Sequence, residues 1–334
     1  MTVPFRLKAH FPMAVYTEVS DDALNAFLAD YDIGTAVACK GIAEGVENSN
    51  FALRTSSGDF ILTLYEKRVE VAELPYFLGL MNHLANRGIV CPRPVAGRDG
   101  VSLRRLQCRA AAITTFLPGV WPRRMRLEHC AQVGAALAAL HVAGRGYPAV
   151  RENALGPSGW APLLARSRGH PDAGSLPPGL LDELQSALEA VLSAWPAPGV
   201  LPCGHIHADL FPDNVFFLDG RLSGLIDFYF AAFDVLAYDI AICLNAWCFE
   251  PDQSISAPKA RALIDAYDAA RSLSAQERAA LPALCQGAAL RFAVTRLFDW
   301  LATPSGAMVT RKDPMEFVRR LRFHRAAKVA DYGL

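Results

Sequence analysis

The first third of the chain alternates short apolar runs with polar turns, which is the pattern of β-strands. Such runs occupy positions 37–41, 51–55, 60–65, 104–106 and 111–116. Ser56-Ser57-Gly58-Asp59 separates two of them and is typical of a tight hairpin turn. Two helical patterns interrupt the strands: one follows Ser20, which is suited to be its N-cap, and the other covers 74–84. The pattern therefore predicts a β-rich N-terminal region.

The pattern becomes helical after Leu117-Pro118-Gly119. Apolar residues now recur every three or four positions, and predict helices over 127–141, 180–195, 258–272, 276–302 and 313–330. Residues 144–179 contain many glycines and prolines and predict a loop with short helical pieces. One hairpin, 214–217 and 222–226 around Asp219-Gly220, is the only strand-like segment expected in this part.

This order of elements predicts an α+β protein with two lobes. We expect a small β-rich, nucleotide-binding N-lobe at residues 13–117 and a larger, mainly helical C-lobe at 118–334, which would carry catalysis and acceptor binding. Met13 opens a strand-like segment, so residues 1–12 are predicted to be a poorly structured extension.

Composition and charge narrow the class of protein. The 334 residues contain 33 Lys and Arg and 33 Asp and Glu, so the formal net charge is zero, and 52% of the residues are hydrophobic. Such a chain is not expected to be disordered, and it offers no electrostatic reason to bind nucleic acid or an anionic membrane. Eight scattered cysteines without a CxxC motif predict buried, reduced thiols and a cytoplasmic location. The sequence says nothing of the oligomeric state.

The strongest chemical signal is His207-Ala208-Asp209-Leu210-Phe211-Pro212-Asp213-Asn214, followed by Ile226-Asp227-Phe228. In kinase-type phosphoryl transfer, H-x-D-x-x-x-x-N is a catalytic loop and a later Asp binds metal. Asp209 is therefore the predicted base, and Asn214 and Asp227 are the predicted Mg²⁺ ligands, because Mg²⁺ prefers hard oxygen donors. Polar residues that merely cap loops could produce part of this pattern. The spacing, the intervening hairpin and the β-rich region upstream favour the catalytic interpretation.

These motifs resemble the superfamily of aminoglycoside phosphotransferases and choline kinases, which are relatives of protein kinases. The resemblance rests on HADLFPDNVFF, LIDF and YDIA, and softer stretches such as ENSNFAL (47–53), CPRPV (91–95) and DVLAYDIAICLNAWCF (234–249) are similar to its homoserine kinases. It implies a two-lobe kinase-like fold and phosphorylation of the homoserine side-chain hydroxyl by ATP with Mg²⁺, a step toward threonine. It also implies that His207, Asp234 and Asp239 support the catalytic loop.

The resemblance further implies a set of nucleotide contacts. The Thr115 carbonyl and the Leu117 amide would bind adenine, and Asn48 and Ser49 would face the phosphates, although ordinary turn residues are an equal alternative for the last two. Thr63 stands where relatives carry the phosphate-binding cation, and strand alternation places Lys67 on the same face. Lys67 could reach back to the phosphates or be a solvated strand-end lysine, and Glu73 is preferred over Glu66 and Glu70 as the acidic partner.

The acceptor site is less defined. Homoserine carries an ammonium and a carboxylate, so its site needs an acid or carbonyl cluster together with an Arg or amide donors. Candidates are Asn245, Trp247, Glu250 and Arg296, with core packing as the alternative for Trp247 and a surface or structural ion pair as the alternative for Arg291 and Arg296. Two other functions stay open: another small-molecule kinase of this fold, acting on an aminoglycoside, choline, methylthioribose or an amino sugar, and a nucleotide-binding pseudokinase, suggested by Thr63.

Overall fold

The computed structural model describes residues 17–42, 48–66, 70–303 and 311–332. The chain divides into two compact units. The first contains the described residues up to Leu78 together with Arg93–Phe116, and the second contains Gly79–Pro92 and the residues from Leu117 onward. The expected extension at 1–12 lies outside the described residues. A β-sheet N-terminal region and a helical C-terminal part confirm the predicted α+β plan.

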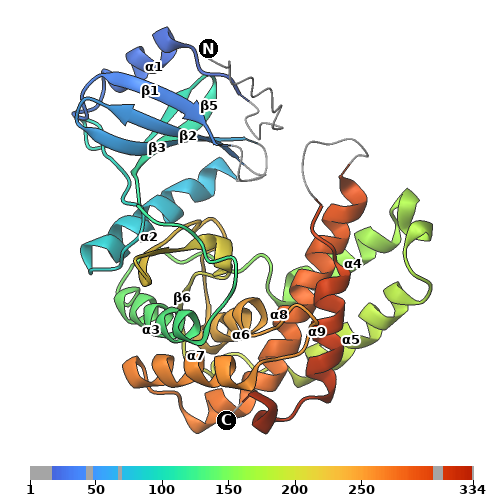
Figure 1. Ribbon diagram of the computed structural model, residues 1–334. Helices are drawn as coiled ribbons and strands as arrows, with labels where there is room; N and C mark the ends of the chain where they lie inside the picture. The colour runs from blue at the N-terminus through green and yellow to red at the C-terminus, as the bar shows by residue number, and fades with distance from the viewer. Residues whose placement is uncertain (1–16, 43–47, 67–69, 304–310, 333–334) are drawn as a thin grey trace, which may run out of the picture. The chain divides into compact units, whose positions relative to one another are not determined.

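The first unit is built on a five-stranded antiparallel sheet. Its strands lie in the order β1-β2-β3-β5-β4 (Figure 1), with bounds β1 Ala36–Gly41, β2 Asn48–Thr55, β3 Gly58–Tyr65, β4 Leu103–Leu106 and β5 Arg109–Thr115. Thr55 pairs with Gly58 across a turn of only Ser56 and Ser57, which lies within the predicted turn 56–59. This tight connection fixes the register of β2 against β3.

Helix α1 (Asp21–Leu28) covers one face of this sheet (Figure 1). The Ser20 hydroxyl accepts a hydrogen bond from the Ala23 amide at 3.3 Å, which confirms Ser20 as the N-cap. The helix packs on apolar side chains of the strands, including Phe51, Leu53, Leu62, Leu64 and Ile113. Because neighbouring strand residues point to opposite faces, Thr63 lies on the face away from this core.

The second unit is mainly helical. Its helices are α3 Leu127–Ala143, α4 Pro157–Arg168, α5 Leu180–Ala194, α6 Leu236–Trp247, α7 Ala257–Ala270, α8 Ala275–Ala302 and α9 Met315–Ala326, and α2 (Leu74–Asn86) passes from the first unit into the second. The prediction of a loop with short helical pieces over 144–179 underestimated the length of α4, a helix of 12 residues. Pro157 fits its first turn, and Trp160 is fully buried, so tertiary packing outweighs a composition poor in helix formers.

Two short antiparallel strand pairs frame the loops of this unit. The predicted hairpin is present as β7 (Val215–Leu218) and β8 (Arg221–Leu225). The expectation that it would be the only strand-like segment was wrong, because β6 (Cys203–Ile206) pairs with β9 (Ala232–Val235). Four-residue strands carry too little periodicity to be detected, and the partner of β6 lies far along the chain.

Two expectations about the surface can be compared with the structure. All eight cysteines are free, and Cys91, Cys130, Cys243, Cys248 and Cys285 are buried as expected, but Cys108 and Cys203 are exposed. Within the described ranges, no helix combines the length and the apolar composition that crossing a membrane requires.

Helices α3 and α7 pack closely because Gly134 lacks a side chain. A Cβ atom built on Gly134 would lie 2.0 Å from the Leu263 carbonyl oxygen of α7. We therefore expect Gly134→Ala to lower the free energy of unfolding by about 1–3 kcal/mol, although alanine favours an isolated helix. Urea unfolding followed by circular dichroism measures this. Gly174→Ala, which has open space around it, is the control; equal stability of the two variants would contradict the packing argument.

Candidate active site

Residues 207–214 form a loop between β6 and β7. Strand β6 ends at Ile206, and a 3-10 turn over Pro212–Asn214 leads the chain into β7. Ala208 in this loop has φ 62°, a left-handed conformation that is uncommon for residues other than glycine. Such backbone strain persists only where the surroundings enforce it. The contacts around the loop show what enforces it here.

A buried carboxylate on α6 anchors the loop. Asp239 accepts hydrogen bonds from the backbone amides of His207 at 2.7 Å and Ala208 at 2.9 Å, and from His141 Nε2 at 3.1 Å. Burial alone would raise the pKa of Asp239, but the hydrogen bonds from His141 and from the His207 amide outweigh it and lower the pKa below its ordinary value. Asp239 lies inside α6, which begins at Leu236, so it is a loop anchor and not the helix cap.

The anchor is supported by a chain of buried donors. Since ionised Asp239 can only accept, His141 carries its hydrogen on Nε2, and its Nδ1 accepts from the Tyr267 hydroxyl at 2.7 Å. Tyr267 in turn accepts from Arg271 at 3.1 Å, and Arg271 pairs with Glu277 at 2.8 Å. The donors of His141 and Tyr267, and one of the two from Arg271, point toward Asp239. Helices α3, α7 and α8 thus hold the loop through polar contacts.

His207 connects the loop to the segment that carries Asp227. Its side chain is fully buried, and Nε2 donates to the Ile226 carbonyl at 3.0 Å while Nδ1 accepts from the Asp209 amide at 3.3 Å. Burial lowers the pKa of His207, which keeps the ring neutral. These contacts fit a role in shaping the loop.

Asp209 lies in the loop beside Asn214. The Asn214 side-chain amide donates to the Asp209 carbonyl at 2.8 Å and to its carboxylate at 3.2 Å. Burial raises the pKa of Asp209 to about 8, the Arg291 guanidinium opposes this shift, and Asp227 adds to it. A carboxylate with a raised pKa is suited to accept a proton near neutral pH.

Asn214 and Asp227 are brought together by the backbone. The Ile226 amide donates to the Asn214 carbonyl at 3.0 Å, and Asp227 follows with φ 64°. Because Nδ2 of Asn214 faces Asp209, its Oδ1 points away from that carboxylate. Among the described residues, no three His, Cys, Asp or Glu side chains converge on one point. Two oxygen donors fit a kinase Mg²⁺ ion, whose remaining ligands are phosphate and water.

Arg291 is a site residue for which the sequence suggested only a surface or structural ion pair. It is almost fully buried on α8, and it donates to the Ala208 carbonyl of the loop. Its guanidinium lies 4.5 Å from the Phe292 ring centroid, and its charge lowers the pKa of Asp209. Only the fold could reveal this contact, because Arg291 is 83 positions away from Ala208 along the chain.

The resemblance had implied that Asp234 supports the catalytic loop, but its hydrogen-bond partners Asn153 and Val235 lie outside that loop. Asp234 lies on β9, where it accepts from the Asn153 amide at 2.8 Å and from the Val235 backbone amide at 2.7 Å. It therefore fixes the segment before α4 to the β6–β9 pair.

In the first unit, three polar residues share the sheet face opposite α1. Thr63 is buried and donates to Asn50 Oδ1 at 2.8 Å, and Asn48 accepts from the Glu66 backbone amide at 3.4 Å. Asn48, Asn50 and Thr63 alternate onto one face through the β2–β3 register. Asn50 was not among the residues predicted from the sequence. Only the alternation of side chains along the strand, starting from Asn48, could have indicated it.

Ser49 lies on the other face. It is fully buried and donates to Glu66 at 2.7 Å, and Glu66 also pairs with Arg109 at 3.2 Å. The prediction that Ser49 faces the phosphates is therefore not favoured, because its hydroxyl is directed toward the α1 side. Glu73 ends a 3-10 turn before α2, and Lys67 lies outside the described residues.

The adenine candidates are Thr115 and Leu117. The Thr115 amide donates to the Arg93 carbonyl at 2.9 Å, and its hydroxyl accepts from the Arg93 amide at 3.0 Å. Leu117, in the second unit, packs against Gly224 so closely that a Cβ there would lie 2.7 Å from Leu117 Cδ1. Ser223 also donates to the Pro118 carbonyl at 2.7 Å. The β7–β8 hairpin thus fixes the segment that follows Phe116.

Two acceptor candidates are buried in the core of the second unit. The Asn245 side-chain amide donates to the carbonyls of Ala241 and Cys285, and its oxygen lies 3.0 Å from His324 Nε2. The Trp247 indole N–H donates at 2.7 Å to the carbonyl of Leu210, which belongs to the catalytic loop. Neither residue is exposed, so direct contact with an acceptor is not favoured for them.

The other two candidates are charged and more accessible. Glu250 pairs with Lys259 at 2.6 Å. Arg296 pairs with Glu316 at 2.5 Å, and its guanidinium lies 4.4 Å from the Phe317 ring centroid.

Comparisons with known proteins agree with this geometry. Homoserine kinase of Granulibacter bethesdensis is 68% identical over 323 residues, which cover 96% of this chain and 100% of that protein. Homoserine kinase of Gluconacetobacter diazotrophicus is 64% identical with the same coverage. Among solved structures, an amicoumacin kinase in complex with AMP-PNP and Ca²⁺ has TM-score 0.70 at 14% identity, covering 93% of this chain and 95% of that chain.

A choline kinase from Cryptosporidium parvum has TM-score 0.64 at 12% identity, covering 92% of this chain and 94% of that chain, and at such low identity both solved structures show the fold alone. Residues 38–273 match the phosphotransferase enzyme family, and this range contains the loop 207–214 and Asp227. The chain therefore belongs to the phosphotransferase enzyme family and, within it, to the homoserine kinases.

Proposed function

We propose that this protein transfers the terminal phosphoryl group of ATP to the side-chain hydroxyl of L-homoserine, giving O-phospho-L-homoserine, a step toward threonine. The similarity to curated homoserine kinases over almost the whole chain carries the choice of acceptor. The loop that brings Asp209 to Asn214, with Asp227 beside it, supports the reaction type. The free cysteines suit a cytoplasmic location.

In this proposal Asp209 accepts or orients the proton of the acceptor hydroxyl. Arg291, the Asp239 anchor and His207 keep the loop in the conformation that presents this carboxylate. Catalysis then depends mainly on positioning, because phosphoryl transfer requires little covalent chemistry from the protein. The proton leaves the hydroxyl oxygen as that oxygen bonds to the γ-phosphorus of ATP, and the bond from this phosphorus to the bridging oxygen of the β-phosphate breaks, so that ADP leaves.

Asn214 and Asp227 would hold Mg²⁺, which when bound neutralises charge on the phosphates. Asn48, Asn50 and Thr63 supply polar groups on one sheet face for the nucleotide, with the Thr115 carbonyl and the Leu117 amide as its adenine contacts. The nucleotide-binding region would thus lie within 13–117, and acceptor binding within 118–334. Lys67 and Glu73 stay as candidates for the phosphate-binding cation and its partner.

An ADP-release screen tests the function. The purified protein is supplied with ATP and Mg²⁺ and, in turn, homoserine, choline, methylthioribose or kanamycin. We expect turnover with homoserine and loss of turnover on removal of Mg²⁺ by EDTA. Turnover restricted to another acceptor would refute the homoserine assignment. No phosphotransfer to any acceptor, with nucleotide binding retained, would instead indicate a pseudokinase.

A further inference from the structure

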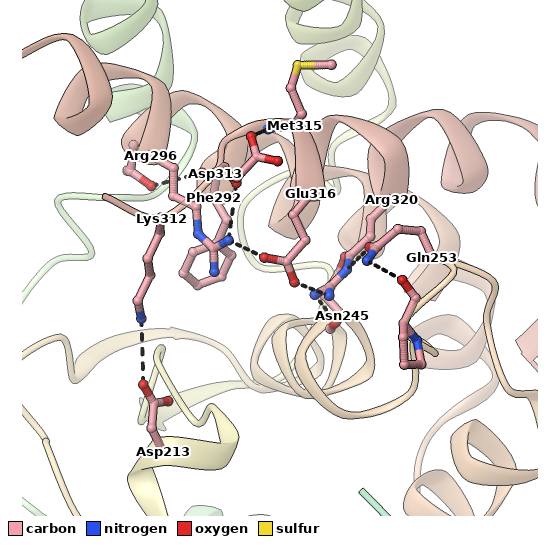
Figure 2. Close-up of polar contacts among 12 residues, drawn as sticks. Asp213, Asn245, Gln253, Phe292, Arg296, Lys312, Asp313, Met315, Glu316 and Arg320 are labelled. Atoms are coloured by element: carbon pink, nitrogen blue, oxygen red, sulfur yellow. Dashed lines mark hydrogen bonds and ion pairs between the residues drawn. The ribbon is translucent and has the colours of Figure 1, made fainter. Parts of the chain in front are cut away.

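Two arginines and one glutamate meet where α8 faces α9. Glu316 accepts from Arg296 at 2.5 Å through one carboxylate oxygen and from Arg320 through the other (Figure 2). Arg320 is held further by the Asn245 carbonyl at 2.6 Å and the Gln253 side-chain oxygen at 3.2 Å. We call these three side chains the Arg–Glu–Arg cluster.

The cluster has one positive charge in excess. Two guanidinium groups share a single carboxylate, and the Arg320 side chain is only 8% exposed. Burial lowers the pKa of Arg320 to about 10, Glu316 opposes this shift, and Arg296 adds to it. Burying an arginine beside a second arginine is unfavourable unless another anion compensates it. The cluster is therefore suited to receive one further carboxylate.

Two other ion pairs of this unit do not share this imbalance. Arg271 with Glu277, and Arg322 with Glu183, each join one cation to one carboxylate. In the Arg–Glu–Arg cluster, the two members nearest to solvent are Arg296, 12% exposed, and Glu316, 33% exposed. A cation and an anion are thus partly exposed side by side, which is the arrangement that a zwitterionic amino acid requires.

An aromatic group connects this cluster to the catalytic loop. Phe211, two positions after Asp209, packs on Phe292 with ring centroids 4.8 Å apart, and Phe292 packs on Phe317 at 5.0 Å. The guanidinium groups of Arg296 and Arg320 lie 4.4 and 4.6 Å from the Phe317 centroid. The Phe211 and Phe317 centroids also lie 6.0 Å apart, so the three rings form one group that joins the catalytic loop to the cluster.

A lysine before α9 forms an ion pair with the catalytic loop. Lys312 lies 3.6 Å from Asp213 of the catalytic loop (Figure 2). Asp313, the neighbour of Lys312, accepts from the Met315 amide at 2.9 Å, just before α9. The start of α9 is therefore adjacent to the catalytic loop.

We propose that Arg296 binds the α-carboxylate of the amino-acid acceptor and Glu316 binds its α-ammonium group, with Arg320 as the positioning residue that holds Glu316. This assignment rests on the proposed function, because it takes a hydroxyl-bearing α-amino acid as the acceptor. It identifies the residues that distinguish such an acceptor from an amino alcohol, which lacks the carboxylate.

The test compares homoserine with two analogues that each lack one head group. 3-Aminopropan-1-ol has no carboxylate, and 4-hydroxybutanoate has no ammonium. We expect Arg296→Met to lower kcat/KM for homoserine by about 10- to 100-fold, the effect of losing a charge-assisted hydrogen bond, and to leave 3-aminopropan-1-ol nearly unaffected. Glu316→Gln should lower kcat/KM for homoserine similarly and spare 4-hydroxybutanoate. Where an analogue turns over too slowly, its inhibition constant against homoserine replaces kcat/KM.

Arg322→Met is the matched control, because Arg322 lies on α9 with Glu316 and Arg320 but pairs with Glu183 at 2.7 Å. It should leave kcat/KM for homoserine unchanged. Arg296→Lys keeps the charge but not the planar fork, and should give an intermediate loss if Arg296→Met fails to fold. The KM for ATP should not move in any of these variants.

Equal losses for homoserine and the analogues would overturn the assignment, because they would show that the cluster only braces α8 against α9. An unchanged kcat/KM in Arg296→Met and Arg296→Lys would overturn it as well. The wild-type protein separates this failure from that of the proposed function. If the wild-type protein does not phosphorylate homoserine, the proposed function is wrong. If it does, the variants test only the proposed role of the Arg–Glu–Arg cluster.

Discussion

Asp209→Asn should lower kcat for homoserine phosphorylation by about 10²- to 10⁴-fold while leaving the Kd for ATP nearly unchanged. Asparagine keeps the size of the side chain and can still bond to Asn214, but it cannot take the proton of the acceptor hydroxyl. Steady-state kinetics and nucleotide titration measure the two effects separately. Near-native turnover would show that Asp209 is not the base.

The same variant should be more stable than wild type at neutral pH. Burial raises the pKa of Asp209 to about 8, so the folded state binds this proton more tightly than the unfolded chain does. Wild-type stability therefore falls as the pH rises from about 4 toward 8, and asparagine removes this contribution. The gain in melting temperature should grow with pH across that window. Asp219→Asn, at an exposed turn with φ 51°, is the control and should change neither turnover nor this pH dependence.

Asp239→Asn should impair both stability and turnover. The asparagine oxygen can replace one acceptor, but its amino group would meet a backbone amide or His141, which also donate. Each buried donor left without an acceptor costs about 1–3 kcal/mol, so we expect a loss of about 2–5 kcal/mol in unfolding free energy. Because the loop would no longer be held, kcat should fall with it.

Urea unfolding across pH tests this expectation. The pKa of Asp239 is lowered in the folded state, so its stabilisation is present above the ordinary carboxyl value of 3.8 and is lost as the pH falls through the lower folded value. The difference between wild type and variant should therefore be constant at neutral pH and shrink in acid. Asp265→Asn, on the exposed side of α7, is the control. A variant with wild-type stability would contradict the anchoring role.

The elements of the fold were predictable to different extents. Alternation and turn residues located β3 and the β2–β3 turn, and Ser20 correctly located the start of α1. Strand β6 and its partner β9 were not found, because four residues show no clear period and their pairing joins positions about 30 apart. The length of helix α4 was underestimated because buried packing of Trp160 stabilises a segment whose own composition favours a loop.

The residues of the candidate site were likewise predictable to different extents. Spacing alone selected Asp209, Asn214 and Asp227, because a phosphotransfer loop needs those residue types close together in sequence. The sequence also included Arg296 among the acceptor candidates, but it could not choose that residue over Asn245, whose amide is buried and fully bonded. Exposure and hydrogen-bond partners separate the two, and both are properties of the folded chain.

By itself, then, the sequence determined the α+β plan, the reaction type and the family, because these depend on local periodicity and on one contiguous motif. The tertiary structure decided what surrounds that motif. Arg291 donates to the carbonyl of Ala208, which is 83 positions away along the chain. Glu316 forms ion pairs with two arginines, one on α8 and one on α9. Charges that are balanced over the whole chain are unbalanced at that point. Coulomb interactions and desolvation depend on distance in space, which a list of residues does not contain.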